Sequence, residues 1–237
     1  SFTPNDILLV DETADPLNIL DSLGAVFRVP ETAGGRARLV YSSLSLQQPS
    51  ALEWSATGEL ILAASRGSSP GQIYRFNTSS GGLILLTTAA DSALRSPSDL
   101  LLASDGGLFV VDPDARGPTP ASRGVVFRKA SGTGPLSVFA SDSLFRSPRE
   151  MCYGPDGHLY LADPQADPDH RGGNTGALFV LDEDTGQVLD WVEDPGLLPE
   201  PLGVAPYDDS TLVVTDLYGS SGTQGRGSCW RCSRRTP

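Results

Sequence analysis

The sequence is poor in histidine, methionine and cysteine, with two, one and three residues in a chain of 237. Three thiols form at most one intramolecular disulfide, which excludes a fold stapled by disulfides. No apolar run approaches the roughly 18 residues of a membrane helix, so we expect no transmembrane segment. Positive charge is also scarce: the net charge of −12 argues against nucleic acid as a partner, because both molecules are polyanions.

Glycine and proline are abundant instead, with 26 and 19 residues spread along the whole chain. Many short strands joined by many turns require such a composition, whereas helices need longer uninterrupted stretches. We therefore expect an all-β fold. The acidic composition and the first residue, Ser1 where a methionine would start translation, predict a secreted, extracellular protein.

A motif recurs about every 50 residues, and its first anchor is a proline that opens a strand-like run. These prolines are Pro49, Pro97, Pro148 and Pro201, with spacings of 48, 51 and 53 residues. The runs end in turn-forming residues, such as Asp105-Gly106, that suit a tight link between antiparallel strands.

The second anchor is an apolar strand directly after that turn, as in HLYLAD at 158–163. A nearly continuous apolar run indicates a strand that is covered on both faces. Four of the five copies end in aspartate: Asp11, Asp112, Asp163 and Asp216. We expect these side chains to accept hydrogen bonds from turn amides, and a shared metal or ligand site is the alternative.

The third anchor is a glycine followed three residues later by an aromatic residue, and usually then by arginine. The aromatic residues are Phe27, Tyr74, Phe127, Phe179 and Trp230, and the arginines are Arg28, Arg75, Arg128 and Arg231. A motif that occurs once per repeat usually serves the repeat itself. We expect the aromatic rings to pack between repeats and the arginines to pair with a repeat aspartate or carbonyl.

A fourth strand-like run closes each repeat, so each repeat predicts a sheet of four antiparallel strands, which is the blade of a β-propeller. The predicted fold is an all-β propeller of about five four-stranded blades, with the first and last blades incomplete. We expect a single domain over 1–237, with blades at about 1–48, 49–96, 97–147, 148–200 and 201–237.

The repeat resembles those of the NHL-type and SMP-30/gluconolactonase-like propellers, and the segment from Pro148 to Val180 is the best match. The resemblance implies that the proline-led strand lies innermost, around a central channel. It also implies a divalent metal in that channel, held by Glu, Asn and Asp. Only Asp163 or Asp216 matches the aspartate role, and the N-terminal glutamate has no clear counterpart.

The acidic links between second and third strands suggest a cation site. In the link at 163–176, Asp163, Asp167 and Asp169 supply hard oxygen ligands at close spacing, a composition compatible with Ca²⁺. The order of ligands differs from that of an EF-hand loop, so a solvated acidic loop is the alternative.

The ends of the repeat array predict self-association. The first copy begins at its second strand and the last stops after its third, which gives 18 strands where five complete blades need 20. Unpaired edge strands seek partners, so terminal strands could join copies into a homo-oligomer or filament. Cys229 and Cys232 occupy strand positions on opposite faces, which favours buried thiols or an inter-subunit role over a bridge between them.

We therefore expect a non-catalytic, secreted propeller that acts as a self-assembling structural subunit. A recognition module for a protein or small-molecule ligand is the first alternative. An SMP-30-like, metal-dependent lactonase or hydrolase is the second, and the two histidines come with no G-x-S-x-G partner for serine hydrolysis.

Overall fold

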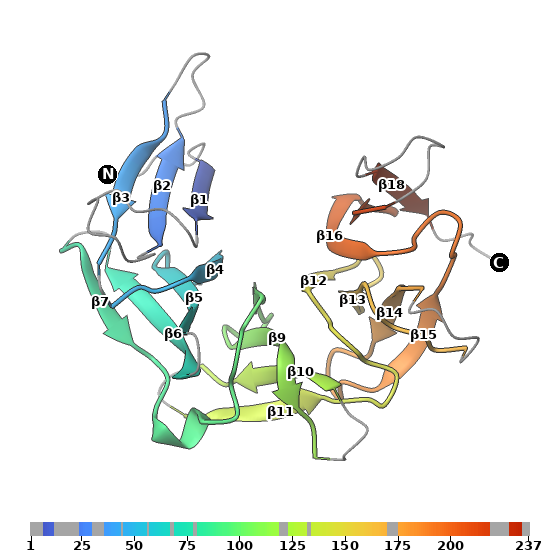
Figure 1. The fold of residues 1–237 in the computed structure, drawn as a ribbon, viewed down its shortest axis with the longest axis horizontal. Helices are drawn as coiled ribbons and strands as arrows, with labels where there is room; N and C mark the ends of the chain where they lie inside the picture. Colours follow the sequence, from blue (N-terminus) through green and yellow to red (C-terminus); the bar gives the residue numbers. More distant parts are fainter. Residues whose placement is uncertain are drawn as a thin grey trace. The chain divides into compact units, whose positions relative to one another are not determined.

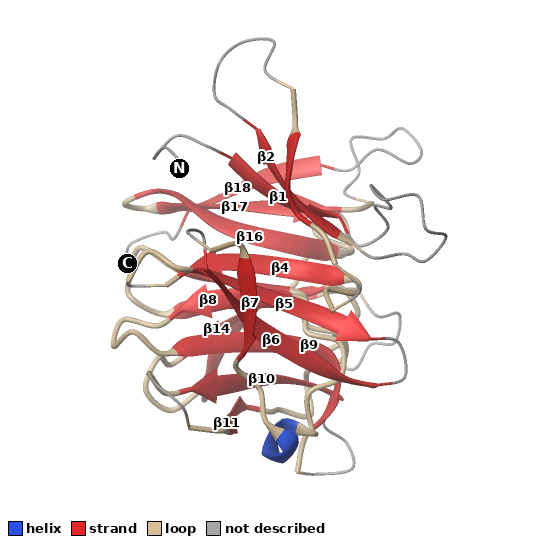
Figure 2. Ribbon diagram, turned by 90° about the vertical axis from the view of Figure 1, so that its left-hand side faces the viewer, coloured by secondary structure: helices blue, strands red, loops and turns tan. Residues whose placement is uncertain are grey.

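The computed structural model describes residues 7–11, 24–29, 36–43, 45–55, 57–66, 69–77, 80–118, 123–131, 134–169, 175–218 and 228–233. These residues form β-strands and one short 3₁₀ helix, η1 (Ala89–Asp91), as Figure 2 shows. Within these ranges no helix is long and apolar enough to cross a membrane.

Three of the five sheets have four strands, and each is a meander of sequence neighbours (Figure 1). The second sheet holds β4 (Pro49–Trp54), β5 (Leu60–Arg66), β6 (Ser69–Asn77) and β7 (Gly82–Leu85). The third holds β8 (Asp99–Leu102), β9 (Leu108–Arg116), β10 (Arg123–Lys129) and β11 (Leu136–Ala140). The fourth holds β12 (Glu150–Tyr153), β13 (Leu159–Asp163), β14 (Ala177–Leu181) and β15 (Val188–Val192).

The first and last sheets have three strands each. The first consists of β1 (Ile7–Asp11), β2 (Ala25–Val29) and β3 (Arg38–Tyr41), and the last of β16 (Pro201–Asp208), β17 (Thr211–Asp216) and β18 (Ser228–Ser233). The predicted class is confirmed: the chain is a β-propeller of about five antiparallel blades, and among the described residues the first and last blades show three strands each.

The chain divides into two compact units, so a single domain over 1–237 remains a prediction. The first unit comprises Ser1–Leu108 and Ala130–Leu136, and the second comprises Phe109–Lys129 and Ser137–Pro237. Each unit has a core made between two consecutive sheets. In the first, Val26 and Leu46 pack with Leu60, Leu62 and Tyr74.

The core of the second unit joins the fourth sheet to the fifth. Cys152, Tyr160 and Leu178 pack there with Val204 and Val214, and all five side chains are at most 6% exposed. Burial of such aliphatic and aromatic surface contributes about 25 cal/mol per Å² and is the main force that holds neighbouring blades together.

The glycine and proline anchors of the repeat touch each other across successive sheets. A Cβ placed on Gly24, Gly71, Gly124 or Gly176 would overlap the ring of the proline that opens the next inner strand, which is Pro49, Pro97, Pro148 or Pro201 respectively. Gly24, Gly124 and Gly176 also have φ values between 60° and 77°. The glycine therefore recurs because both the close approach and the left-handed backbone disfavour any other residue.

Candidate functional site

Three carboxylates of the fourth sheet form a compact acidic cluster. The oxygens of Asp167, Asp169 and Glu193 lie within 4.8 Å of one another. Asp167 and Asp169 follow β13, whereas Glu193 follows β15, the outer strand of the same sheet. A meander brings these segments together because the second-to-third-strand link and the end of the fourth strand lie at the same end of a blade.

Two hydrogen bonds hold this cluster in place. The Thr175 hydroxyl donates to Glu193 Oε1, and the Gly176 N–H donates to the Ala166 carbonyl at 3.0 Å. The first orients the glutamate, and the second closes the base of the loop that carries the two aspartates. Carboxylate oxygens at this separation match the ligands that Ca²⁺ takes in proteins.

Asp163, the first of the three predicted calcium ligands, lies outside this cluster. Its side chain is fully buried and accepts hydrogen bonds from the N–H groups of Arg146 (2.7 Å), Ser147 and Gln165 (3.0 Å each). Burial raises the pKa of Asp163, while these N–H groups and the charge of Arg146 act in the opposite direction. Glu193 is the third carboxylate of the cluster. The spacing of residues within the link at 163–176 did not predict it, because Glu193 lies outside that link.

The aspartates of the second strands accept hydrogen bonds from nearby main-chain groups. Asp11, Asp163 and Asp216 end their strands as predicted, whereas Asp112 lies inside β9, which continues to Arg116. Asp216 is 2% exposed and accepts from the N–H groups of Glu200 and Tyr218, both at 2.8 Å. Asp112 is buried and accepts from the N–H groups of Asp114 and Ala115, both at 3.0 Å. Asp11 ends β1 opposite Ala25. Asp163 and Asp216 each bind the segment just before the inner strand of their own blade.

Two of the repeated arginines contact other side chains, and three of the repeated aromatic residues are buried. Arg75 pairs with Glu59 at 3.4 Å, and the guanidinium carbon of Arg128 lies 4.6 Å from the centre of the Phe109 ring. Tyr74, Phe127 and Phe179 are buried, and Phe27 is half-buried, beside Arg28 on β2. The side chains of Trp230 and Arg231 lie outside the described residues.

The structure describes the side chain of one of the three cysteines. Cys152 is a buried thiol in the core of the second unit. Cys229 and Cys232 lie on β18 opposite Thr215 and Leu212, but their side chains lie outside the described residues. Their inter-subunit role therefore remains a prediction.

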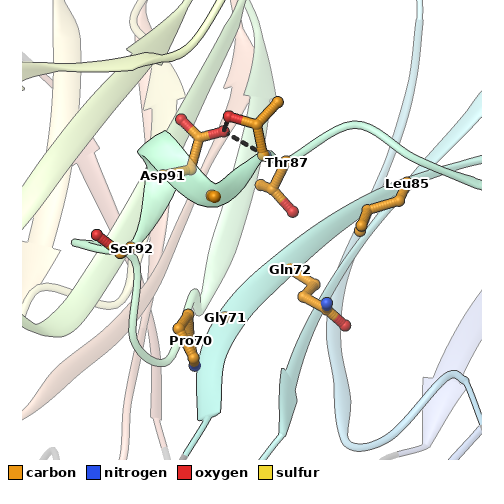
Figure 3. Close-up of a pocket in the computed structure, with 9 residues that line it drawn as sticks. Pro70, Gly71, Gln72, Leu85, Thr87, Asp91 and Ser92 are labelled. Atoms are coloured by element: carbon orange, nitrogen blue, oxygen red, sulfur yellow. Dashed lines mark hydrogen bonds between the residues drawn. The ribbon is translucent and has the colours of Figure 1, made fainter.

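The second sheet has a pocket beside the start of β6 and η1 (Figure 3). Strand pairing sets Tyr74 opposite Leu85 and Phe179 opposite Trp191, so Thr87 corresponds to Glu193. The pocket has a volume of about 300 Å³, and Gln72, Thr87 and Asp91 are among its lining residues. The Asp91 carboxylate is already hydrogen-bonded within the protein, because it accepts from the N–H groups of Thr88 and Leu136, both at 2.6 Å.

Two inner-strand glutamates were missed by the sequence analysis. Glu53 on β4 and Glu150 on β12 are half-buried, and burial raises the pKa of both carboxyl groups. Glu53 accepts a hydrogen bond from the N–H of Trp54 at 2.6 Å. Their positions four and two residues after the anchor prolines were the available signal, but neither position is acidic in every copy.

The outer strands of the complete blades expose apolar side chains. Each of β7, β11 and β15 is the last strand of its sheet. Among large hydrophobic residues there, the exposed ones are Ile84 and Leu85 on β7, Val138 on β11, and Leu189, Trp191 and Val192 on β15. β15 carries three such residues, including the only exposed tryptophan on these three strands. Of the three outer strands it therefore has the most exposed large hydrophobic side chains.

No family model and no curated protein matches the sequence. Solved structures do match the fold. A gluconolactonase from Xanthomonas campestris has a TM-score of 0.56 and 20% identity, over 82% of this chain and 63% of that one. A virginiamycin B lyase from Staphylococcus aureus has a TM-score of 0.57 and 13% identity, over 89% and 64%. A luciferin-regenerating enzyme has a TM-score of 0.62 and 13% identity, over 97% and 74%.

These likenesses establish the fold and confirm the resemblance to gluconolactonase-like propellers at that level. The chain spans less than two thirds of the gluconolactonase and lyase chains that it matches. The matched proteins carry different activities, as expected for a fold that hosts many functions.

Proposed function

We propose that this chain is a non-catalytic propeller that associates with copies of itself through the exposed face of β15. The observation that carries the proposal is the exposure of Leu189 (48%), Trp191 (42%) and Val192 (46%) on one five-residue strand at the edge of its sheet. Adjacent apolar side chains of this size on a surface strand favour association. Tryptophan is also over-represented among residues that dominate binding energy.

Side chains, and not additional backbone pairing, make this contact. The N–H of Trp191 already donates to the Asp190 carboxylate at 2.9 Å, which occupies a donor that an added strand would need. Leu189 is the extra residue of a β-bulge between Val188 and Asp190, and both Leu189 (48%) and Trp191 (42%) are exposed to solvent there. A second copy presents the same apolar pair, so a self-complementary contact can form.

Support for a non-catalytic role comes from Asp163 and Asp216. These are the residues that match the aspartate of the lactonase pattern, and both are buried and bonded to main-chain N–H groups. The gluconolactonase likeness leaves hydrolysis as the alternative. The proposal includes an extracellular location, for which the acidic composition is the argument.

Substitution on β15 tests the proposal. We expect Trp191→Lys to weaken self-association, measured by sedimentation velocity over a concentration series, by at least about tenfold, because a central aromatic contact is lost. Ile84→Lys on β7 makes the same charge change at a similarly exposed outer strand and should retain association. Purely monomeric wild-type protein, or equal effects of the two variants, would rule out the β15 contact.

The acidic cluster supports a second property, the binding of Ca²⁺ by Asp167, Asp169 and Glu193. Glu193 directly follows Val192, so the ion would stabilise the end of the strand that carries the proposed contact. We expect calcium to bind in calorimetric titrations and to raise the melting temperature, because a ligand of the native state stabilises it.

Glu193→Gln is expected to abolish this heat and this shift, while retaining the hydrogen bond from Thr175. Asp184→Asn, on an exposed turn of the same sheet, serves as the matched control and should bind normally. If Glu193→Gln binds calcium with wild-type affinity, the ion binds elsewhere. If the wild-type protein gives no heat of calcium binding, the proposed site is wrong.

A further inference from the structure

A separate cavity lies in the second unit, between the β12–β13 turn and the end of β16. The inner strands β12 and β16 are neighbours (Figure 1). The cavity has a volume of about 400 Å³, and its lining includes two tyrosines, two prolines and two aspartates: Tyr153, Pro155, Pro206, Tyr207, Asp208 and Asp209. A volume of this size falls in the range of small-ligand pockets.

The wall formed by the β12–β13 turn is closely packed and hydrogen-bonded. A Cβ on Gly154 would overlap the Tyr160 ring, so the ring packs directly on the turn backbone. The Tyr160 hydroxyl donates to Asp156 at 3.0 Å, and the Gly154 N–H donates to the His158 carbonyl at 2.8 Å. The Tyr153 hydroxyl donates to Glu183 at 2.8 Å, which fixes the direction of this ring.

The opposite wall presents an exposed aromatic ring beside negative charge. Tyr207 is 65% exposed at the end of β16. Asp208 accepts from the N–H and hydroxyl of Ser210 at 2.9 and 3.0 Å, an arrangement that orients its carboxylate, and Asp209 follows on the exposed turn. The neighbouring turns of the fourth sheet add further carboxylates, at Asp156, Asp182, Glu183 and Asp184.

Aromatic faces beside carboxylates select a planar cation. A guanidinium group stacks on tyrosine and also donates paired hydrogen bonds to a carboxylate, whereas an ammonium group acts as a hydrated point charge. The acidic turns would attract a basic segment and repel an acidic one. We propose that this cavity binds an arginine side chain of a basic peptide segment, with Tyr207 and Tyr153 against the guanidinium plane and Asp208 or Asp209 accepting its N–H groups.

This site is independent of the β15 contact and of the calcium cluster, so it can fail or succeed separately. The test is a titration, followed by ¹H–¹⁵N NMR, with the blocked tripeptide Gly-Arg-Gly. The same peptide with citrulline in place of arginine keeps the shape and loses the charge. We expect the arginine peptide to shift the amide signals of Gly154 and Asp209 and to bind at least about tenfold more tightly than the citrulline peptide.

Two variants locate the site. Tyr207→Ala removes an exposed ring without opening the core, and Asp209→Asn keeps the shape of the turn. We expect each to weaken binding at least about fivefold, a typical loss for one cation–π or charge contact. Tyr218→Ala is the matched control, because Tyr218 is 56% exposed and lies outside the cavity lining.

The proposal is overturned if the arginine peptide does not bind, or if it binds no more tightly than the citrulline peptide. It is also overturned if Tyr207→Ala and Tyr218→Ala have equal effects on binding.

Discussion

At the scale of single residues, the glycine–proline contact is the most demanding feature of the repeat. Gly176 has φ = 71°, and a Cβ there would overlap Pro201. Gly58 has φ = 74°, but no atom lies within 4 Å of a Cβ at that position. The two glycines therefore separate the cost of a left-handed backbone from the cost of a steric overlap.

We expect Gly176→Ala to lower the free energy of unfolding by about 3 kcal/mol or more, since backbone strain and overpacking add. Gly58→Ala should lose only about 1–2 kcal/mol, the strain alone. Urea denaturation of both variants measures the difference. Equal losses would show that Pro201 moves aside without cost.

The half-buried glutamate Glu150 predicts a pH dependence of stability. Burial raises the pKa of Glu150 above its ordinary value of 4.5. The folded state then holds the proton more tightly than the unfolded state, so the stability from this group is complete below pH 4.5. It is lost as pH rises through the raised pKa.

Glu150→Gln removes this titration. The melting temperature of the variant minus that of the wild type should therefore increase with pH from below 4.5 to neutral, measured by differential scanning calorimetry. Asp184→Asn, on the exposed turn, controls for the loss of one negative charge. A difference that stays constant with pH would mean that burial does not perturb Glu150.

At the scale of elements, the repeat predicted the strands well because it has a fixed period and three anchors. The predicted run at 158–163 corresponds to β13 (Leu159–Asp163), and the strand-like runs that close the repeats correspond to β3, β7, β11 and β15. A strand buried on both faces has a continuous apolar pattern that is readable without the fold. This explains why the strands of each sheet could be predicted from the spacing of the anchors together with the apolar runs.

The site was less predictable, because it is assembled from segments that are distant in sequence. Asp169 and Glu193 belong to different links of one blade, and only the antiparallel path brings their carboxylates together. The cavity between Tyr153 and Tyr207 similarly depends on two successive blades. An aromatic residue near the end of the inner strand, at Trp54, Tyr153 and Tyr207, was the signal in the sequence.

At the scale of the whole molecule, the net charge and the exposed apolar side chains have opposite effects on self-association. A net charge of −12 keeps copies apart through mutual repulsion, whereas the apolar face of β15 favours contact. Calcium bound beside Val192 would reduce the repulsion where the contact forms. We therefore expect self-association to be local to β15.

Hydroxyl-radical footprinting with mass spectrometry, at low and high protein concentration, tests this claim most directly. We expect Trp191 and Leu189 to become protected as concentration rises, because a second copy covers them. Trp54, which is 37% exposed on an inner strand, should react equally at both concentrations. Unchanged modification of Trp191 and Leu189 in a sample that sedimentation shows to be associated would contradict the β15 contact.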